Sequence, residues 1–371
     1  MSKTVLVLGG AYGGLHVAHA LLKKQLKDVK VVLVTKNTHF YWNLASIRRI
    51  IPGQYKDEDI LKPIEPALKR YPSTSYELII GSAEAADFAS KTVRVATATG
   101  DRTVAYDQLV LATGSRTPEP DMPWKASSTY EEVVALLKET EDKVKAASHI
   151  VVAGAGATGV ELAGELGFEF GKTKEIILLS AGDKVLGGDI AAPAAANELK
   201  KLNVAIKYGA KVESTRPAAE GSGKTEVVLA GGETIATDLY LPTMGLVPNT
   251  EYVPTQFLNE NKTVKVDEFL RVLETTDVWA AGDVVSKPRA GFMITQKQAA
   301  AVAKNVELAL ADKAPLVAKG LPVDILACAV GRSRGAGRMN SFRLPSLGVW
   351  LAKGRTLGLQ MMGGYLDGGV A

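Results

Sequence analysis

The feature that most constrains this chain of 371 residues is a glycine-rich turn close to its start. An apolar run at residues 4–8 leads directly into the turn at residues 9–14, and apolar residues with helical spacing follow at 15–22. A strand, a glycine turn and a helix in this order open a βαβ unit that binds a dinucleotide. The start of the chain therefore predicts a parallel α/β fold.

The turn departs from the usual pattern at one position. In a G-x-G-x-x-G pattern the outer glycines are Gly9 and Gly14, but the middle position is Ala11. The middle glycine normally lets the backbone approach a diphosphate, and a methyl group crowds that approach. The turn alone therefore does not identify its ligand.

The next strand ends without the acidic residue that often binds a ribose. A β-branched run at residues 29–34 predicts a buried strand, which is followed by Thr35 and Lys36. The Thr35 hydroxyl is able to bond a ribose, whereas Lys36 suits a phosphate. The end of this strand therefore does not identify the nucleotide. Further on, Arg48 either neutralises a diphosphate near the first turn or is a solvated surface arginine. The aromatic tract before it, at residues 39–42, is expected either to pack or to face a cofactor.

Short alternating runs between residues 76 and 104 predict a small antiparallel excursion. The following strand ends in Ala112, Thr113 and Gly114, which indicates a tight crossing at the edge of a nucleotide domain. Several prolines then mark a linker, and a helix is expected over about 130–147.

A second glycine turn is complete and lies in the expected context. Gly154, Gly156 and Gly159 stand between a predicted strand at 149–153 and a helix, with another strand at 175–179. This arrangement is a strong signal for a second dinucleotide site. Ser180 stands where a carboxylate would bind a ribose, and no arginine follows closely for a 2′-phosphate. The choice between NADH and NADPH is therefore open.

Composition excludes several other classes. The chain is 46% hydrophobic and 23% charged, and its net charge of +4 comes from scattered basic residues, which argues against a nucleic-acid site. Cys328 is the only cysteine, so it forms no disulfide framework or redox pair, and its apolar surroundings favour a buried structural thiol. The histidines show no metal-binding spacing, so no metal is expected.

Targeting signals are also lacking in the sequence. No signal peptide or membrane-spanning stretch is recognisable, and Ser2 excludes N-myristoylation. We expect a cytoplasmic protein. In the C-terminal region basic residues stand beside apolar ones, which indicates either peripheral contact with a membrane or a plain surface loop with a docking helix.

Five motifs in a fixed order carry a resemblance to a known family. These are the two glycine turns, the Ala-Thr-Gly at 112–114, the Gly-x-x-Pro-Asn turn at 245–249 and the late Gly282-Asp283. The chain resembles the flavoproteins with two dinucleotide-binding domains. The tracts at 39–48 and 331–337 are similar to the ferroptosis suppressor group, to which type II NADH dehydrogenases are related.

The resemblance implies an α/β fold of two Rossmann-like domains, in which an NAD(P)H domain is inserted into an FAD domain. The expected FAD domain comprises residues 1–116 and 246–312, and the NAD(P)H domain comprises 117–245. Residues 313–371 would form an α+β tail that covers the flavin or mediates an interface.

The motifs and the resemblance together predict the cofactor contacts. The carboxylate of Asp283 is expected at the ribityl chain of the flavin. The residues expected to bind FAD are Gly9, Gly10, Ala11, Tyr12, Gly13, Gly14, Thr35, Lys36, Arg48, Ala112, Thr113, Gly114, Gly282 and Asp283. Those expected to bind NADH or NADPH are Gly154, Gly156, Thr158, Gly159 and Ser180.

The activity that the resemblance implies is oxidation of NAD(P)H with transfer of electrons to a quinone or similar small acceptor. Glu161 and Lys353 are the candidate catalytic residues. Glu161 either positions the nicotinamide or only favours the dipole in the first turn of a helix, and Lys353 either orients or protonates the acceptor or is a solvated surface lysine. Two alternatives are a signalling or nucleic-acid-binding flavoprotein like apoptosis-inducing factor, and a reductase of a small redox protein. The sequence leaves the acceptor and the oligomeric state open.

Overall fold

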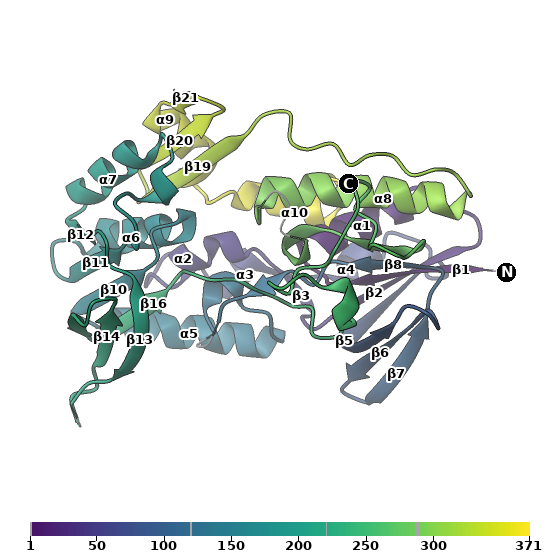
Figure 1. Ribbon diagram of the computed structural model, residues 1–371, viewed down its shortest axis with the longest axis horizontal. Coiled ribbons are helices and arrows are strands. Elements are labelled where there is room, and N and C mark those ends of the chain that lie inside the picture. Colours follow the sequence, from purple (N-terminus) through teal and green to yellow (C-terminus); the bar gives the residue numbers. More distant parts are fainter. Residues whose placement is uncertain (1, 119–120, 220, 286–288) are drawn as a thin grey trace.

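The computed structural model describes residues 2–118, 121–219, 221–285 and 289–371. Two sheets lie at opposite ends of an elongated molecule, and the C-terminal region runs along one side of both (Figure 1).

The larger sheet contains the first strand of the chain near its middle. The strand order is β18 (Val278–Ala280), β8 (Gln108–Leu111), β1 (Lys3–Leu8), β2 (Val29–Thr35), β5 (Tyr76–Asp87), β6 (Thr92–Thr97) and β7 (Gly100–Ala105). The first five are parallel, and the last two continue the sheet in antiparallel pairing. The inner residues of β1 are fully buried, as expected for a parallel strand covered on both faces.

The antiparallel excursion expected at 76–104 is therefore confirmed as the second half of β5 with β6 and β7. Helices α1 (Tyr12–Lys23) and α8 (Phe292–Leu310) pack against each other beside this sheet (Figure 1). Short elements connect β2 to β5, namely β3 (His39–Tyr41), α2 (Ser46–Arg49), α3 (Asp57–Ile60), β4 (Leu61–Pro63) and α4 (Glu65–Leu68).

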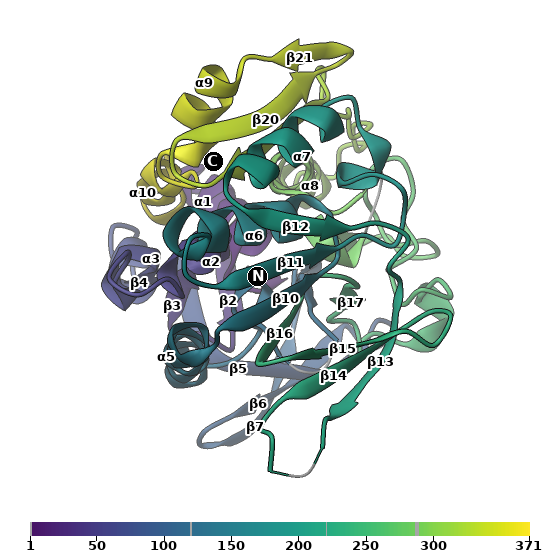
Figure 2. The ribbon, with the colours of Figure 1, turned by 90° about the vertical axis from the view of Figure 1, so that its left-hand side faces the viewer.

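The second sheet repeats the parallel architecture on a smaller scale (Figure 2). Its strands are β12 (Val204–Lys207), β11 (Glu175–Leu179), β10 (His149–Ala153) and β16 (Leu239–Pro242), all parallel. Helices α5 (Tyr130–Ala146), α6 (Ala157–Phe170) and α7 (Ala192–Lys201) belong to this part, as does an antiparallel sheet of β13 (Val212–Pro217), β14 (Thr225–Leu229) and β15 (Thr234–Thr237).

The chain enters and leaves the second unit at one place. Strand β9 (Ser115–Arg116) pairs with β17 (Val247–Pro248), so the outgoing and returning segments lie side by side. The late strand β18 then joins the larger sheet next to β8. This connectivity confirms the predicted fold, in which one Rossmann-like unit is inserted into another.

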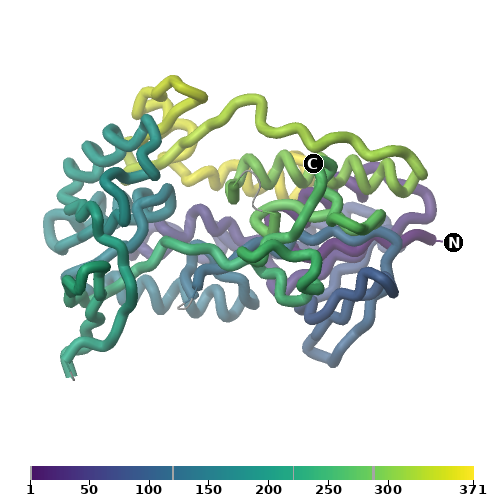
Figure 3. The backbone as a smooth tube through the Cα atoms, in the orientation of Figure 1, coloured from purple at the N-terminus to yellow at the C-terminus, as the bar shows by residue number. Residues whose placement is uncertain are grey.

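The C-terminal region bridges the two units (Figure 3). Residues 311–324 lead back along the molecule to an antiparallel sheet of β19 (Ile325–Val330), β20 (Arg334–Met339) and β21 (Phe342–Leu344), which packs on α6 and α7. Helix α9 (Ser346–Val349) and the π-helical turn η6 (Trp350–Gly354) follow, and α10 (Met362–Leu366) lies against α1. Across the described residues, no helix combines the length and apolarity needed to cross a bilayer.

Candidate active site

The first glycine turn has a backbone that only glycine allows at two positions. Gly9 has a φ of +113°, and a methyl group there would lie 2.3 Å from the carbonyl oxygen of Ala112. A methyl group on Gly14 would lie 1.8 Å from the carbonyl oxygen of Gly9. No described side chain caps α1, and its first turn contains no acidic residue. The N–H groups at this helix end are therefore suited to an anion such as a diphosphate.

The second glycine turn repeats this geometry. Gly154 has a φ of +104°, and a methyl group on Gly159 would lie 1.8 Å from the carbonyl oxygen of Gly154. Helix α6 likewise has no side-chain cap and no acidic residue in its first turn. The two turns are thus alike in backbone and in helix end, and Thr158 lies partly exposed at the start of α6.

The middle position of both turns points away from the protein. A methyl group on Gly156 would meet no atom within 4 Å. Ala11, which takes the equivalent place, is exposed and has an ordinary φ of −99°. Ala11 therefore strains neither the backbone nor the packing of the fold, and its methyl group would crowd a bound ligand rather than the protein.

The motifs of the larger unit converge on this first turn. A methyl group on Gly13 would lie 3.6 Å from Cβ of Ala112 and 3.9 Å from the carbonyl oxygen of Ala281. The Ser115 hydroxyl donates to Asp283 at 2.7 Å, which joins the Ala-Thr-Gly strand to the late Gly-Asp.

The Gly-x-x-Pro-Asn turn is attached to the same place. The Thr113 hydroxyl donates to the carbonyl oxygen of Asn249 at 2.7 Å, and the backbone N–H of Asn249 donates to the carbonyl oxygen of Gly114 at 2.9 Å. Helix α8 begins at Phe292. It lies beside the Gly282 turn, since the side chain of Gln298 in this helix accepts the Gly282 N–H at 2.8 Å. Three motifs that are far apart in sequence thus surround the first glycine turn.

The residues that replace the expected carboxylates turn their hydroxyls inward. The Thr35 side chain is buried against Gly10, and its hydroxyl donates to the carbonyl oxygen of Asn37 at 3.2 Å. The Ser180 hydroxyl donates in the same way to Lys184, at 2.9 Å. Lys36 is exposed at the end of β2.

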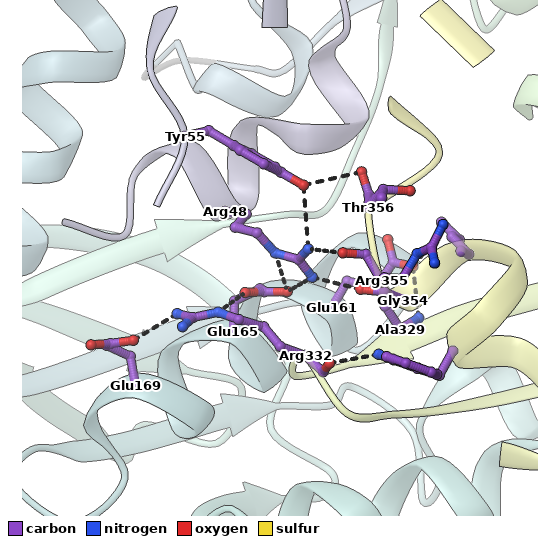
Figure 4. A network of polar contacts seen from close by, with 12 residues as sticks. Arg48, Tyr55, Glu161, Glu165, Glu169, Ala329, Arg332, Gly354, Arg355 and Thr356 are labelled. Atoms are coloured by element: carbon purple, nitrogen blue, oxygen red, sulfur yellow. Dashed lines mark hydrogen bonds and ion pairs between the residues drawn. The ribbon is translucent and has the colours of Figure 1, made fainter. Parts of the chain in front are cut away.

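Arg48 does not face the first turn. The structure gives every N–H of its guanidinium an acceptor: two donate to Glu165 at 2.6 and 3.0 Å, and the others to Tyr55 and to the carbonyl oxygens of Gly354 and Arg355 (Figure 4). Both charged side chains are almost fully buried. This arrangement corrects the predicted diphosphate contact, because no N–H of Arg48 is left to make it.

The Arg48 network instead holds three parts of the chain together. Arg48 lies on α2 of the larger unit, Glu165 lies on α6 of the inserted unit, and the two carbonyl groups belong to the C-terminal region. Glu165 also pairs with Arg332 at 3.3 Å, and Arg332 reaches Glu169 at 2.7 Å (Figure 4). Burial lowers the pKa of Arg48, but Glu165 raises it more, so the guanidinium stays charged.

The aromatic tract before Arg48 packs into the core. Phe40 and Trp42 are fully buried. They form a ring cluster with Tyr12, Phe292 and Tyr365, in which neighbouring centroids lie 5.3–6.2 Å apart. The cluster ties the first turn to α8 and to α10 at the C-terminus.

The two predicted catalytic residues form an ion pair. Lys353 Nζ lies 2.6 Å from Glu161 Oε1, which also accepts the backbone N–H of Ala329 at 2.9 Å. Lys353 in turn donates to the carbonyl oxygen of Ala327 at 3.1 Å, and its side chain is 23% exposed. Burial lowers the pKa of Lys353, but the Glu161 carboxylate outweighs it and the pKa is raised. Lys353 is thus not a solvated surface lysine, and Glu161 lies beyond the first turn of α6.

Cys328 lies beside this pair and is fully buried. Burial raises the pKa of its thiol well above the usual range, and the nearby Glu161 charge raises it further. The thiol therefore stays protonated, as expected for a structural cysteine. Over the part of the chain that the structure describes, no group of three or more His, Cys, Asp or Glu side chains could hold a metal ion.

One residue of the first site has no signal in the sequence. The ammonium group of Lys125 is hydrogen-bonded to Asp283, on the same oxygen that accepts the Ser115 hydroxyl. Lys125 lies in the linker, within the 3₁₀ turn η2 (Pro123–Lys125), where nothing in the local pattern marks a ligand-binding residue.

Comparison with known proteins agrees with this geometry. The family model described as pyridine nucleotide-disulphide oxidoreductase matches residues 3–309. An oxidoreductase of Pestalotiopsis fici, ptaL, is 36% identical, with 99% of each chain aligned. Ferroptosis suppressor protein 1 of Mus musculus is 24% identical, covering 95% of this chain and 93% of its own length.

Solved structures show the same fold. The sulfide:quinone oxidoreductase of Aquifex aeolicus has a TM-score of 0.75 at 17% identity, covering 99% of this chain and 92% of its own. A water-forming NADH oxidase of Lactobacillus brevis, bound to NADH, has a TM-score of 0.73 at 20% identity, covering 91% of this chain and 75% of its own.

Proposed function

Because the chain belongs to the pyridine nucleotide-disulphide oxidoreductase family, we propose that it is an FAD-dependent enzyme that takes hydride from NADH or NADPH and passes electrons to a quinone or similar small acceptor. The observation that carries the proposal is the pair of matching glycine turns at Gly9–Gly14 and Gly154–Gly159, each at an uncapped helix end. Two such turns suit two dinucleotides at once.

The first turn is proposed to hold FAD. The start of α1 would bind the diphosphate, and the Asp283 carboxylate would accept a hydrogen bond from the ribityl chain. The start of α8, beside Gly282, would place its positive dipole end toward the flavin. Bound FAD would supply the hydride acceptance and electron transfer that side chains cannot. The second turn would bind the nicotinamide cofactor.

The cysteine content disfavours a disulfide as the acceptor. Reduction of a disulfide through protein thiols needs at least one accessible thiolate, whereas Cys328 is single, buried and protonated. A quinone acceptor is in keeping with the name of the Aquifex aeolicus relative in fold.

The Glu161–Lys353 pair is proposed to act on the acceptor. Glu161 keeps the Lys353 ammonium charged, and the Ala329 N–H fixes the carboxylate in place. Lys353 would then orient the acceptor and give a proton to its reduced oxygen, and Glu161 would be the residue that positions Lys353.

Contact with a membrane surface is a further part of the proposal. In the C-terminal region Phe342 is 72% exposed, Leu347 and Leu351 are also exposed, and Arg343 stands next to Phe342. Apolar and cationic side chains together suit an anionic lipid surface. Co-sedimentation with vesicles that contain phosphatidylserine, but not with neutral vesicles, would support this contact.

An assay of both half-reactions tests the main proposal. The purified protein should show a flavin spectrum that NADH or NADPH bleaches under anaerobic conditions, and a short-chain quinone should restore the colour. A panel with a ferredoxin, oxygen and dyes would identify another acceptor. Protein that neither retains nor takes up FAD would overturn the proposal, and salt-dependent DNA binding without turnover would favour the signalling alternative.

A further inference from the structure

Asp283 has a built-in cationic partner. Its Oδ2 atom accepts hydrogen bonds from the Lys125 ammonium and from the Ser115 hydroxyl. The Asp283 side chain is 11% exposed and that of Lys125 is 28% exposed. An ionised carboxylate buried to this degree is costly unless a cation compensates it.

Lys125 is held in place by the larger unit. The Tyr41 hydroxyl donates to the carbonyl oxygen of Pro123 at 2.7 Å, and the Asn43 side chain donates to that of Trp124 at 2.6 Å. Trp124 itself is buried. The two residues before Lys125 are therefore each held by a hydrogen bond from the larger unit, which limits the movement of the Lys125 backbone.

The pair lies beside the first dinucleotide turn. A methyl group added to Gly13 would lie 3.9 Å from the carbonyl oxygen of Ala281, two residues before Asp283. It would also lie 3.4 Å from Thr295 of α8, and one added to Gly282 would lie 3.3 Å from the same side chain. If the cofactor diphosphate binds at the start of α1, the rest of the cofactor would thus lie close to the Lys125–Asp283 pair. Burial raises the pKa of Asp283, but Lys125 outweighs it and the carboxylate stays ionised.

We propose that Lys125 is a positioning residue of the flavin site, which holds Asp283 toward the ribityl chain and balances the negative charge that the flavin gains on reduction. The inference rests on the proposed binding of FAD in the first turn. Without Lys125, an uncompensated carboxylate would face the cofactor. Reduced FAD would then be destabilised more than oxidised FAD, because it carries the extra negative charge.

The test measures FAD affinity and flavin midpoint potential in the purified holoprotein, with no acceptor present. In Lys125→Met we expect FAD to bind at least about tenfold more weakly. The preference for reduced over oxidised FAD should also fall by about tenfold, which corresponds to a potential lower by about 30 mV for a two-electron couple. Lys125→Arg should keep both values within about twofold.

A double variant separates charge compensation from simple packing. In Lys125→Met combined with Asp283→Asn, no carboxylate needs a partner, so the potential should return toward that of the wild type. Lys138→Met, which removes an exposed partner of Asp142, serves as the matched control and should change neither value.

Unchanged affinity and potential in Lys125→Met would overturn the proposal, as would an equal loss in the double variant. If Lys125→Met retains no flavin, the double variant must regain it for the proposal to stand. Because no acceptor enters these measurements, their failure would leave the assignment of the quinone untouched. Failure of the quinone assay would in turn leave the measurements of FAD affinity and midpoint potential valid.

Discussion

Lys353 Nζ lies 2.6 Å from the Glu161 carboxylate, although one residue belongs to the inserted unit and the other to the C-terminal region. The pair therefore exists only when the C-terminal region is packed on α6. This relationship places the two candidate catalytic residues in one ion pair and makes their effects on activity dependent on each other.

Removing the carboxylate should move the alkaline limit of activity. The pKa of Lys353 is raised by Glu161 against the opposing effect of burial. In Glu161→Gln the main effects that raise this pKa are lost while the lowering effect of burial remains, so Lys353 should lose its proton at a lower pH. We expect the alkaline limb of the pH profile for quinone reduction to shift downward, and turnover at neutral pH to fall about 10- to 100-fold.

Stopped-flow measurement of the two half-reactions locates this effect. Lys353→Met should slow reoxidation of the reduced flavin by quinone and leave its reduction by NADH within about threefold of the wild type. Equal slowing of both half-reactions would contradict the role at the acceptor. The double variant that combines Glu161→Gln with Lys353→Met should be no slower than Lys353→Met alone, because Glu161 acts through the lysine.

The middle position of the second turn offers a clean test of the nicotinamide site. A methyl group on Gly156 meets no protein atom within 4 Å, whereas one on Gly159 would lie 1.8 Å from the Gly154 carbonyl oxygen. Gly156→Ala should therefore fold normally and retain FAD, but raise KM for NADH several-fold. Gly159→Ala should reduce the yield of folded protein. A Gly156→Ala variant with an unchanged KM for NADH would contradict the assignment of the nicotinamide cofactor to this turn.

The first turn allows the reverse change. Ala11 is exposed, and its methyl group has no role in the fold. Ala11→Gly should preserve or tighten FAD binding, measured by fluorescence titration of FAD into the apoprotein. A clear loss of affinity would show that the diphosphate does not approach this turn.

The buried Arg48–Glu165 pair should dominate the stability of the interface between the units. Among the residues that the structure describes, Arg48→Met leaves Glu165 paired with Arg332 alone, at the longer distance of 3.3 Å. Breaking a buried pair typically costs about 3–5 kcal/mol, whereas an exposed pair contributes about 0–1 kcal/mol. Urea denaturation should show this loss in Arg48→Met. A matched change at the exposed Lys138–Asp142 pair should have little effect. Equal effects of the two changes would refute the assignment.

Two buried histidines should make the protein sensitive to acid. Burial lowers the pKa of His16 and of His19 to about 4, against about 6.5 in an unfolded chain. Their contribution to stability is complete above pH 6.5 and is lost as the pH falls toward 4, because only the unfolded chain takes up the protons readily. We expect a loss of about 2 kcal/mol per histidine between pH 7 and pH 5.

Urea denaturation at several pH values checks this expectation. The double variant His16→Gln with His19→Asn should lose correspondingly less stability over the same range. The ring of His19 is hydrogen-bonded to the hydroxyl of Tyr71, and the amide introduced by His19→Asn keeps a polar group at that place. Parallel pH profiles of the variant and the wild type would contradict the prediction.

Local pattern was sufficient for the two dinucleotide turns and most strands of the parallel sheets. A positive φ, a close helix approach and a buried β-branched strand each depend on neighbours within a few residues, so they leave a readable signature. Strand β13 left none, because its residues are mainly exposed and polar. Strand β20 was missed for another reason: glycines disfavour a strand, yet Gly335 and Gly337 are needed where Val349 packs closely against them.

The sequence by itself determined the class of fold, the order of the motifs and the lack of a cysteine pair. Only the tertiary structure decided the partners of the charges. Arg48 faces Glu165 and not a diphosphate, Lys353 meets Glu161, and Lys125 meets Asp283. These contacts join segments that are distant in the chain. The partner of a charge there is set by how the units and the C-terminal region pack, and no local pattern records it.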